Sequence, residues 1–192
     1  IKHIVAAKGV GKTQLTWYTE GLRTLFFMAH VLPCFTIPIL IGSLDIDLQE
    51  LKDHLLKYKD DRIDDNILAS KFEDSECPYH PLVEELITSV CDVVRQKTEC
   101  GPLDCNRIWS HIHEKNMSTE WHTHQTDLAG VFYVSTPKDS GSLVFRRPDQ
   151  EPVVIPPQEG LFVVFPGWVE HKVTRTYSED LRMSISFNLN YE

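Results

Sequence analysis

The chain has 192 residues, of which 42% are hydrophobic and 24% are charged, a composition typical of one soluble globular domain. Its net charge of -9 disfavours nucleic acid and anionic membranes as partners, because phosphate groups attract surfaces rich in lysine and arginine. The five cysteines include no CxxC pair, which favours reduced thiols and a cytoplasmic location over a disulfide framework.

Residues 1–27 differ from the rest of the chain because they are mildly basic. Met28 opens the stretch MAHVLPCFTIPIL, which is typical of a natural beginning. We therefore predict that residues 1–27 are an upstream or non-native extension and that residues 28–192 form a single domain. The extension contains the triplet Gly11–Lys12–Thr13, but Ala6 stands where a phosphate-binding loop needs its first glycine. This difference argues against nucleotide hydrolysis.

A stretch without fixed charge runs from Thr24 to Leu44 and is long enough to span a bilayer. It contains Pro33 and Pro38, and its second half is rich in β-branched residues. We therefore favour a buried extended segment over residues 34–44 that enters the fold, and not a membrane helix.

Two helices are predicted before residue 100. Residues 47–58 carry leucines at a helical spacing behind a capping aspartate, and residues 80–98 carry a longer apolar stripe with Pro81 in the first turn. A polar turn over 59–66 and a short helix over 67–72 are expected between them.

From about residue 105 the pattern changes to short segments rich in β-branched and aromatic residues, separated by turn residues. Many short strands with close turns indicate a sandwich or barrel. The predicted fold is α+β and mainly β, with an entry strand and helices over 28–104 and a β-core over 105–192. The predicted strands cover residues 107–113, 119–124, 128–135, 141–147, 151–157, 160–166, 170–176 and 181–191.

Polar residues gather where two of these strands meet, in the stretch WHTHQTDLAG. Residues two apart on a strand share a face, so His122 and His124 point the same way. On the next strand Asp127 and Tyr133 share a face by the same rule. If that face is interior, the two histidines and the carboxylate form a plausible metal cluster.

Residues much further along the chain are expected to complete this cluster. His171 follows the apolar strand GLFVVFP and a Pro-Gly turn, and Arg182 opens the strand RMSISFN, on which Ser184 shares its face. A buried charge is costly unless it is paired, and the guanidinium fork suits a carboxylate, so an anionic ligand is expected there. His111 and His113 are expected to be exposed or structural, and the tryptophans to be packing residues.

The pieces RIWSHIHEKN, WHTHQTDLAGVFYV, DSGSLVF, EGLFVVFPGWVEH and RMSISFN, over about residues 105–190, resemble one family. They are similar to the 2-oxoglutarate- and Fe(II)-dependent oxygenases, in a marine bacterial and phage branch of the prolyl-hydroxylase-like superfamily. The resemblance implies a double-stranded β-helix, or jelly roll, in a bacterial or phage-infected cell. It also implies a dioxygenase that uses O2 and hydroxylates an unidentified substrate, with release of succinate and CO2.

The resemblance also implies roles for individual residues. His122 and His171 would bind Fe(II), Arg182 and Ser184 would anchor 2-oxoglutarate, and Tyr133 would donate a hydrogen bond to it. The third ligand is open, because His124 stands where the family has a carboxylate, whereas Asp127 has the expected chemistry. In a third alternative neither residue binds, and a water or halide fills the position. The alternative functions are a cupin-like metal-binding jelly roll without oxygenase activity and a structural jelly roll without metal.

Overall fold

A computed structural model describes residues 37–57, 62–64, 67–71, 80–147 and 150–192, with only the backbone described for 62–64 and 67–71. These residues belong to a unit that runs from Thr36 to Glu192. The predictions for residues 1–27 and for most of the uncharged stretch 24–44 lie outside the described residues. Within the described ranges, every helix is too short or too polar to cross a bilayer.

The described elements form two antiparallel sheets and two helices, so the predicted mainly β jelly roll with N-terminal helices is confirmed. A larger sheet has the order β1-β9-β6-β11-β4-β3-β2, and a smaller sheet has the order β5-β10-β7-β8. The elements are β1 (Leu40–Ser43), α1 (Leu48–Lys57), β2 (Arg62–Asp64), β3 (Ile67–Lys71), α2 (Pro81–Thr98), β4 (Leu103–His113), β5 (Thr119–His122), β6 (Leu128–Ser135), β7 (Leu143–Phe145), β8 (Val153–Ile155), β9 (Leu161–Pro166), β10 (His171–Val173) and β11 (Arg182–Tyr191).

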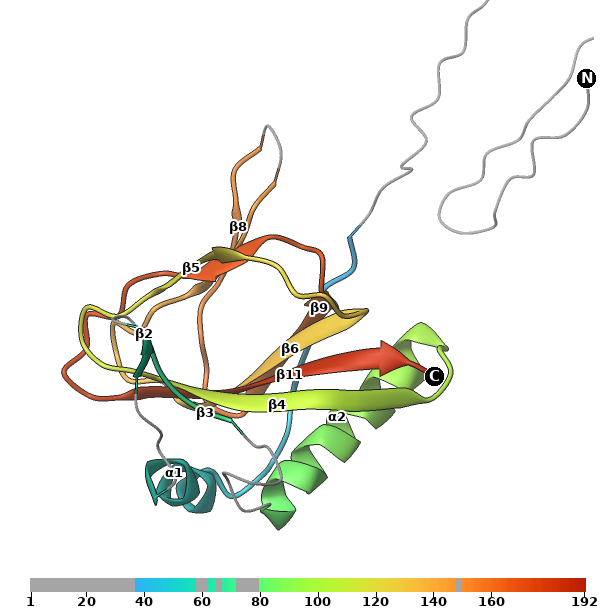
Figure 1. Ribbon diagram of the computed structural model, residues 1–192, viewed down its shortest axis with the longest axis horizontal. Coiled ribbons are helices and arrows are strands. Elements are labelled where there is room, and N and C mark those ends of the chain that lie inside the picture. Colours follow the sequence, from blue (N-terminus) through green and yellow to red (C-terminus); the bar gives the residue numbers. More distant parts are fainter. Residues whose placement is uncertain (1–36, 58–61, 65–66, 72–79, 148–149) are drawn as a thin grey trace, which may run out of the picture. The chain divides into compact units, whose positions relative to one another are not determined.

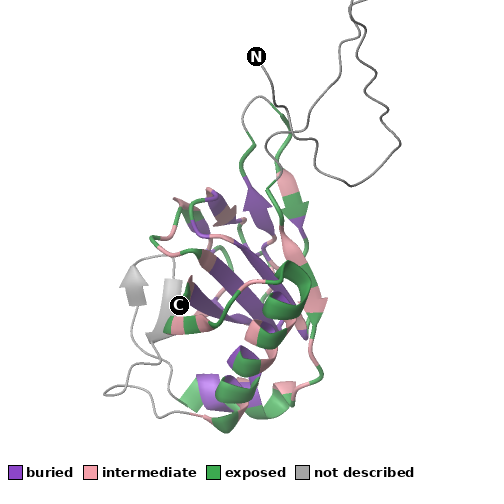
Figure 2. Cartoon of the chain, turned by 90° about the vertical axis from the view of Figure 1, so that its right-hand side faces the viewer, coloured by how far each residue is buried: buried purple, intermediate pink, exposed green. Residues whose placement is uncertain are grey.

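Three layers result, with the smaller sheet on one face of the larger sheet and both helices on the other (Figure 1). One hydrophobic core lies between the helices and the larger sheet and contains Leu86, Val90 and Phe187. A second core lies between the sheets and contains Phe145, Val163 and Phe165. The strands are therefore largely buried, whereas the helices show an exposed outer side (Figure 2). This burial of both sheet faces explains the long apolar runs in the sequence.

Three predicted segments differ from the structure. Residues 62–64 of the predicted polar turn over 59–66 form strand β2. The segment 67–71 is strand β3, not a helix, because it pairs with β4 in the register Leu68↔Ile112, and tertiary pairing outweighs weak local propensity. The described part of the entry segment, residues 37–44, is extended as predicted, but it is only partly buried. Strand β1 is the edge of the larger sheet, paired only with β9, and Ile41 is 49% exposed.

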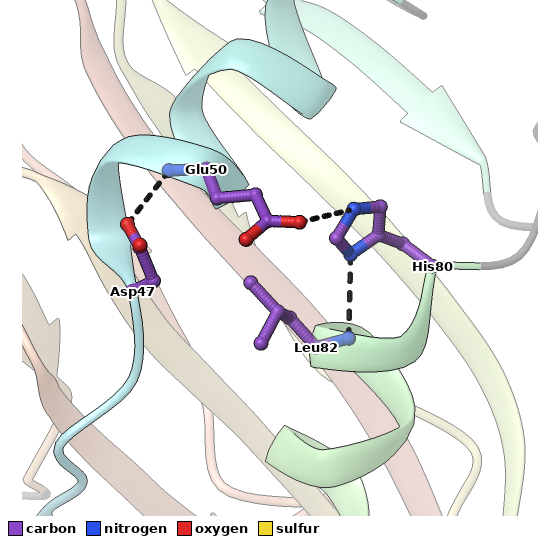
Figure 3. A network of polar contacts seen from close by, with 4 residues as sticks. All are labelled: Asp47, Glu50, His80 and Leu82. Carbon is purple, nitrogen blue, oxygen red and sulfur yellow. Dashed lines mark hydrogen bonds and ion pairs between the residues drawn. The ribbon is translucent and has the colours of Figure 1, made fainter.

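Polar side chains define where both helices begin (Figure 3). The Asp47 carboxylate accepts a hydrogen bond from the Glu50 N–H at 2.9 Å. At the start of α2, the Leu82 N–H donates to His80 Nδ1 at 3.3 Å. His80 Nε2 lies 3.4 Å from a Glu50 carboxylate oxygen, so this one imidazole caps α2 and links it to α1.

Replacing His80 with alanine is expected to lower the free energy of unfolding by about 1 kcal/mol, because it removes a cap and the link to Glu50. Asparagine at the same position keeps a side-chain acceptor and is expected to restore most of the loss. Urea unfolding of the two variants and the parent measures this difference. Equal stability of all three would show that the cap contributes nothing.

Candidate functional site

Three histidines come together between the two sheets. His122 ends β5 and His171 begins β10, and the two residues are paired across these strands. His124 lies two residues beyond the end of β5. One ring nitrogen from each lies within 4.8 Å of the others, an arrangement that can hold a metal ion. His122 and His124 therefore point into the same site, as predicted, although His124 lies beyond the strand on which that prediction relied.

Two of these rings are oriented by backbone carbonyls. The Nδ1 atom of His122 lies 2.8 Å from the Glu120 carbonyl oxygen, and that of His171 lies 2.8 Å from the Val169 carbonyl oxygen. Because a carbonyl only accepts hydrogen bonds, both Nδ1 atoms carry the proton. In the neutral ring this tautomer leaves the Nε2 atom without a proton, which is the form in which histidine binds a metal.

The loop that carries His124 is held against the turn after β9. The His124 N–H donates to the Gly167 carbonyl at 2.8 Å, and the Gly167 N–H donates to the Asp127 carbonyl at 3.1 Å. A Cβ atom at position 167 would lie 2.3 Å from the Thr126 carbonyl oxygen. Glycine is therefore required where this turn, which leads to His171, approaches the loop.

Burial keeps two of these histidines neutral, His124 and His171. Burial lowers the pKa of His171 to about 3, with His122 and His124 adding to the effect and the Val169 carbonyl opposing it. Burial also lowers the pKa of His124 to about 4, assisted by His122 and Arg107. Neutral imidazoles are the competent ligands, so these two side chains are ready to bind a cation at neutral pH.

Asp127 lies outside this group. Its carboxylate accepts a hydrogen bond from the Tyr191 N–H at 2.9 Å, and its side chain is exposed. Among the described residues, the structure brings three histidines together and no carboxylate with them.

Arg182 is the largest of the fully buried side chains and is 1% exposed. Its Nε donates to the Gly141 carbonyl at 3.2 Å, and its Nη1 donates to Ser184 Oγ at 3.1 Å. Within the described part of the chain, no carboxylate forms an ion pair with it. A buried cation without a counter-charge is costly, so the position indicates an anionic ligand.

His113 positions this guanidinium. Its Nδ1 lies 3.2 Å from Arg182 Nη1, and its Nε2 lies 3.2 Å from Thr119 Oγ1. Arginine only donates, so Nδ1 accepts and Nε2 carries the proton toward the threonine. Burial and the Arg182 charge lower the pKa of His113 to about 2. His113 was expected to be exposed or structural, and it is fully buried and contacts Arg182, so its structural role serves the site.

Thr119 is a further residue of the site that the sequence pattern did not indicate. His171 pairs with His122 while Val173 pairs with Thr119, so β5 has one extra residue, a bulge, between these pairs. The bulge lets Thr119 and His122, three residues apart, face the same cavity. Alternation of side chains along a regular strand would have placed them on opposite faces.

Tyr133 completes the buried end of the cavity. The Tyr133 ring lies 5.3 Å from the Arg182 guanidinium carbon. Its hydroxyl is buried and has no hydrogen-bond partner among the described residues. Burial raises the pKa of Tyr133, an effect that Arg182 opposes, so the hydroxyl is a neutral donor. Each sequence-predicted site residue except Asp127 lines this one cavity: His122, His124, His171, Tyr133, Arg182 and Ser184.

A family model described as "Putative 2OG-Fe(II) oxygenase" matches residues 146–188. The matched segment contains His171, Arg182 and Ser184. No curated protein sequence matches the chain.

Several solved structures share this fold. A prolyl-4-hydroxylase from Pseudomonas putida has a TM-score of 0.62 at 14% identity, with 82% of this chain and 94% of that chain covered. The viral collagen prolyl hydroxylase of Paramecium Bursaria Chlorella virus-1, a complex with 2-oxoglutarate, has a TM-score of 0.62 at 12% identity, with 81% and 96% covered. HygX from Streptomyces hygroscopicus, with nickel, 2-oxoglutarate and hygromycin B bound, has a TM-score of 0.64 at 11% identity, with 81% and 84% covered.

Proposed function

We infer that the chain belongs to the 2-oxoglutarate- and Fe(II)-dependent oxygenases, and propose that it is a dioxygenase that hydroxylates an unidentified substrate. The observation that carries this proposal is that the three-histidine group and an unneutralised buried arginine line the same cavity. In a metal-binding jelly roll without a co-substrate, the buried Arg182 guanidinium would have no anionic partner, and its burial would only destabilise the fold.

The residues fit an iron ion. We propose that His122, His124 and His171 hold Fe(II), because they offer three nitrogens from one side and leave the other side open to the cavity. In two of them the Nδ1 atom is hydrogen-bonded to a backbone carbonyl. Metal-binding histidines usually make such a bond, which fixes the orientation of the ring. Imidazole nitrogens are suitable iron ligands, although this set lacks the carboxylate of the common facial triad.

The residues also fit 2-oxoglutarate. We propose that Arg182 and Ser184 bind the carboxylate remote from the metal and that the Tyr133 hydroxyl donates to it. The unpartnered hydroxyl and the uncompensated guanidinium are then satisfied by one ligand group. Both are buried, and the low local dielectric strengthens their interaction with an anion.

In the proposed reaction, one O2 converts 2-oxoglutarate to succinate and CO2, and a C–H bond of the substrate becomes C–OH. Bound Fe(II) supplies the activation of O2 for this chemistry. The chain holds the metal, aligns the co-substrate between the histidines and Arg182, and excludes bulk water. Phe145 and Phe165, which pack beside His171, form the apolar wall that does so.

The function is tested by incubating the full chain with Fe(II), ascorbate and 2-oxoglutarate under air and measuring succinate. Turnover above the metal-free control is expected even without the second substrate, at a reduced rate. A chain that binds neither Fe(II) nor 2-oxoglutarate would overturn the proposal.

The third ligand is tested by three substitutions. Replacing His124 with alanine is expected to weaken metal binding by at least about 10–100-fold, since a ligand is lost. His124→Asp restores a metal-binding side chain at the same position and is expected to recover much of the affinity. Asp127→Ala is the control and is expected to bind metal as the parent does, measured by anaerobic titration with Fe(II). A loss caused by Asp127→Ala alone would assign the role to Asp127 instead.

A further inference from the structure

A row of paired side chains from β4 and β11 lines the cavity face of the larger sheet. His113 is opposite Arg182, His111 is opposite Ser184, and Trp109 is opposite Ser186. Trp109, His111, Ser184 and Ser186 line the cavity together with Arg182. The next pair along the same face is Arg107 opposite Asn188.

Arg107 lies at the other end of this row from Arg182. Position 107 and position 113, which faces Arg182, are six residues apart on β4, a span of roughly 20 Å along a strand. The two guanidinium groups therefore serve different ligand groups. The Arg107 end of the row also lies beside the metal-binding histidines, because the His124 ring is 5.6 Å from the Trp109 ring on which Arg107 stacks.

The Arg107 guanidinium is available for an anion. Its central carbon lies 5.0 Å from the centre of the Trp109 ring, so its face is occupied by the tryptophan while its N–H edge is free. Among the described residues no carboxylate forms an ion pair with it. Its charge reaches the cavity, since it contributes to the lowered pKa values of His111 and His124.

Asn188 is an independent sign of a ligand at this end. Its side chain is 9% exposed, and its Oδ1 atom is buried without a hydrogen-bond partner in the described structure. Buried polar atoms are rarely left unsatisfied. An amide oxygen only accepts hydrogen bonds, so the unpartnered Oδ1 atom indicates a donor group on the ligand. Directly opposed residues of antiparallel strands have Cβ atoms about 5 Å apart, so Arg107 and Asn188 can contact neighbouring groups of one ligand.

We propose that Arg107, beside the Trp109 ring, binds an oxyanion of the primary substrate, either a carboxylate or a phosphate, and that Asn188 Oδ1 accepts a hydrogen bond from a donor group of the same substrate. This inference rests on the proposed function, because it assigns the Arg182 side of the metal to 2-oxoglutarate and the Arg107 side to the substrate. The three histidine ligands add no negative charge. Fe(II), Arg182 and a 2-oxoglutarate dianion together therefore leave one positive charge, which further favours an anionic substrate.

The test uses the full chain with Fe(II) and 2-oxoglutarate, without oxygen, and measures binding by calorimetry. The probes are phenylalkanoates of two to five chain carbons, the matching amides, and the matching phenylalkyl phosphates. We expect at least one acid or phosphate to bind about tenfold or more tightly than its neutral partner, as a charge-assisted hydrogen bond provides. The acids and the phosphates, compared with each other, identify which oxyanion is preferred.

Arg107→Gln is expected to remove that preference and to leave the affinity for 2-oxoglutarate unchanged. Arg146→Gln is the matched control, because Arg146 also stacks on a tryptophan, Trp121, at 4.4 Å, but is paired with Glu170 on the smaller sheet. It is expected to bind all probes as the parent does. Equal binding of acids, phosphates and amides, or no binding of any probe, would overturn the inference. Failure of 2-oxoglutarate to bind the parent would instead overturn the proposed function.

Discussion

Replacing Arg182 with methionine is expected to lower the affinity for 2-oxoglutarate by about 100-fold or more while metal binding persists. The guanidinium is the only buried cation in the described part of the cavity, and charge-assisted hydrogen bonds to a carboxylate contribute about 1.5–3 kcal/mol each. Loss of two such bonds corresponds to a factor of about 100 or more. Titration of the Fe(II)-loaded chain with 2-oxoglutarate in the absence of oxygen measures the effect.

Arg182→Lys is the matched control, because it keeps the charge and loses the planar fork. An intermediate affinity is expected, since lysine cannot make two parallel hydrogen bonds to one carboxylate. Urea unfolding of both variants shows whether the fold persists, which matters because three acceptors contact the guanidinium: Gly141, His113 and Ser184. Unchanged 2-oxoglutarate affinity in a folded Arg182→Met chain would contradict the anchor role.

Regular strands could be predicted well from the sequence. The segment 128–135 was expected as a strand and is β6 with those bounds, because it is rich in apolar, β-branched and aromatic residues and sits between the two cores. The polar face of β11 was also expected from the alternation of Arg182, Ser184 and Ser186 with Met183, Ile185 and Phe187. In the structure the apolar set packs under the helices and the polar set lines the cavity.

Features that depend on local irregularity could not be predicted. The β5 bulge brings Thr119 to His113, and no residue in the sequence marks it. The choice between His124 and Asp127 depends on the turn after β5, where strand parity no longer applies. The partner of His113 is a residue 69 positions away, which a single sequence does not reveal. The site was therefore predictable in its chemistry and in most of its residues, but not in its supporting contacts.

Acid is expected to destabilise the metal-free chain well before its carboxylates titrate. Four histidines around the cavity have lowered pKa values, mainly because of burial: about 2 for His113, about 3 for His111 and His171, and about 4 for His124. In the unfolded chain a histidine titrates near pH 6.5. Below that pH the unfolded state therefore binds protons that the folded state does not.

Because protons bind preferentially to the unfolded state, the free energy of unfolding is highest above pH 6.5 and falls as the pH decreases toward the folded pKa values. At pH 5, each of the two most buried groups, His113 and His171, is expected to remove about 2 kcal/mol. That is a large part of a typical total of about 5–15 kcal/mol. Urea unfolding in the presence of a chelator at pH 7, 6 and 5 measures the loss. His113→Gln removes one of these groups and is expected to give a shallower dependence, whereas equal stability at pH 7 and pH 5 would mean that these imidazoles take up protons in the folded chain.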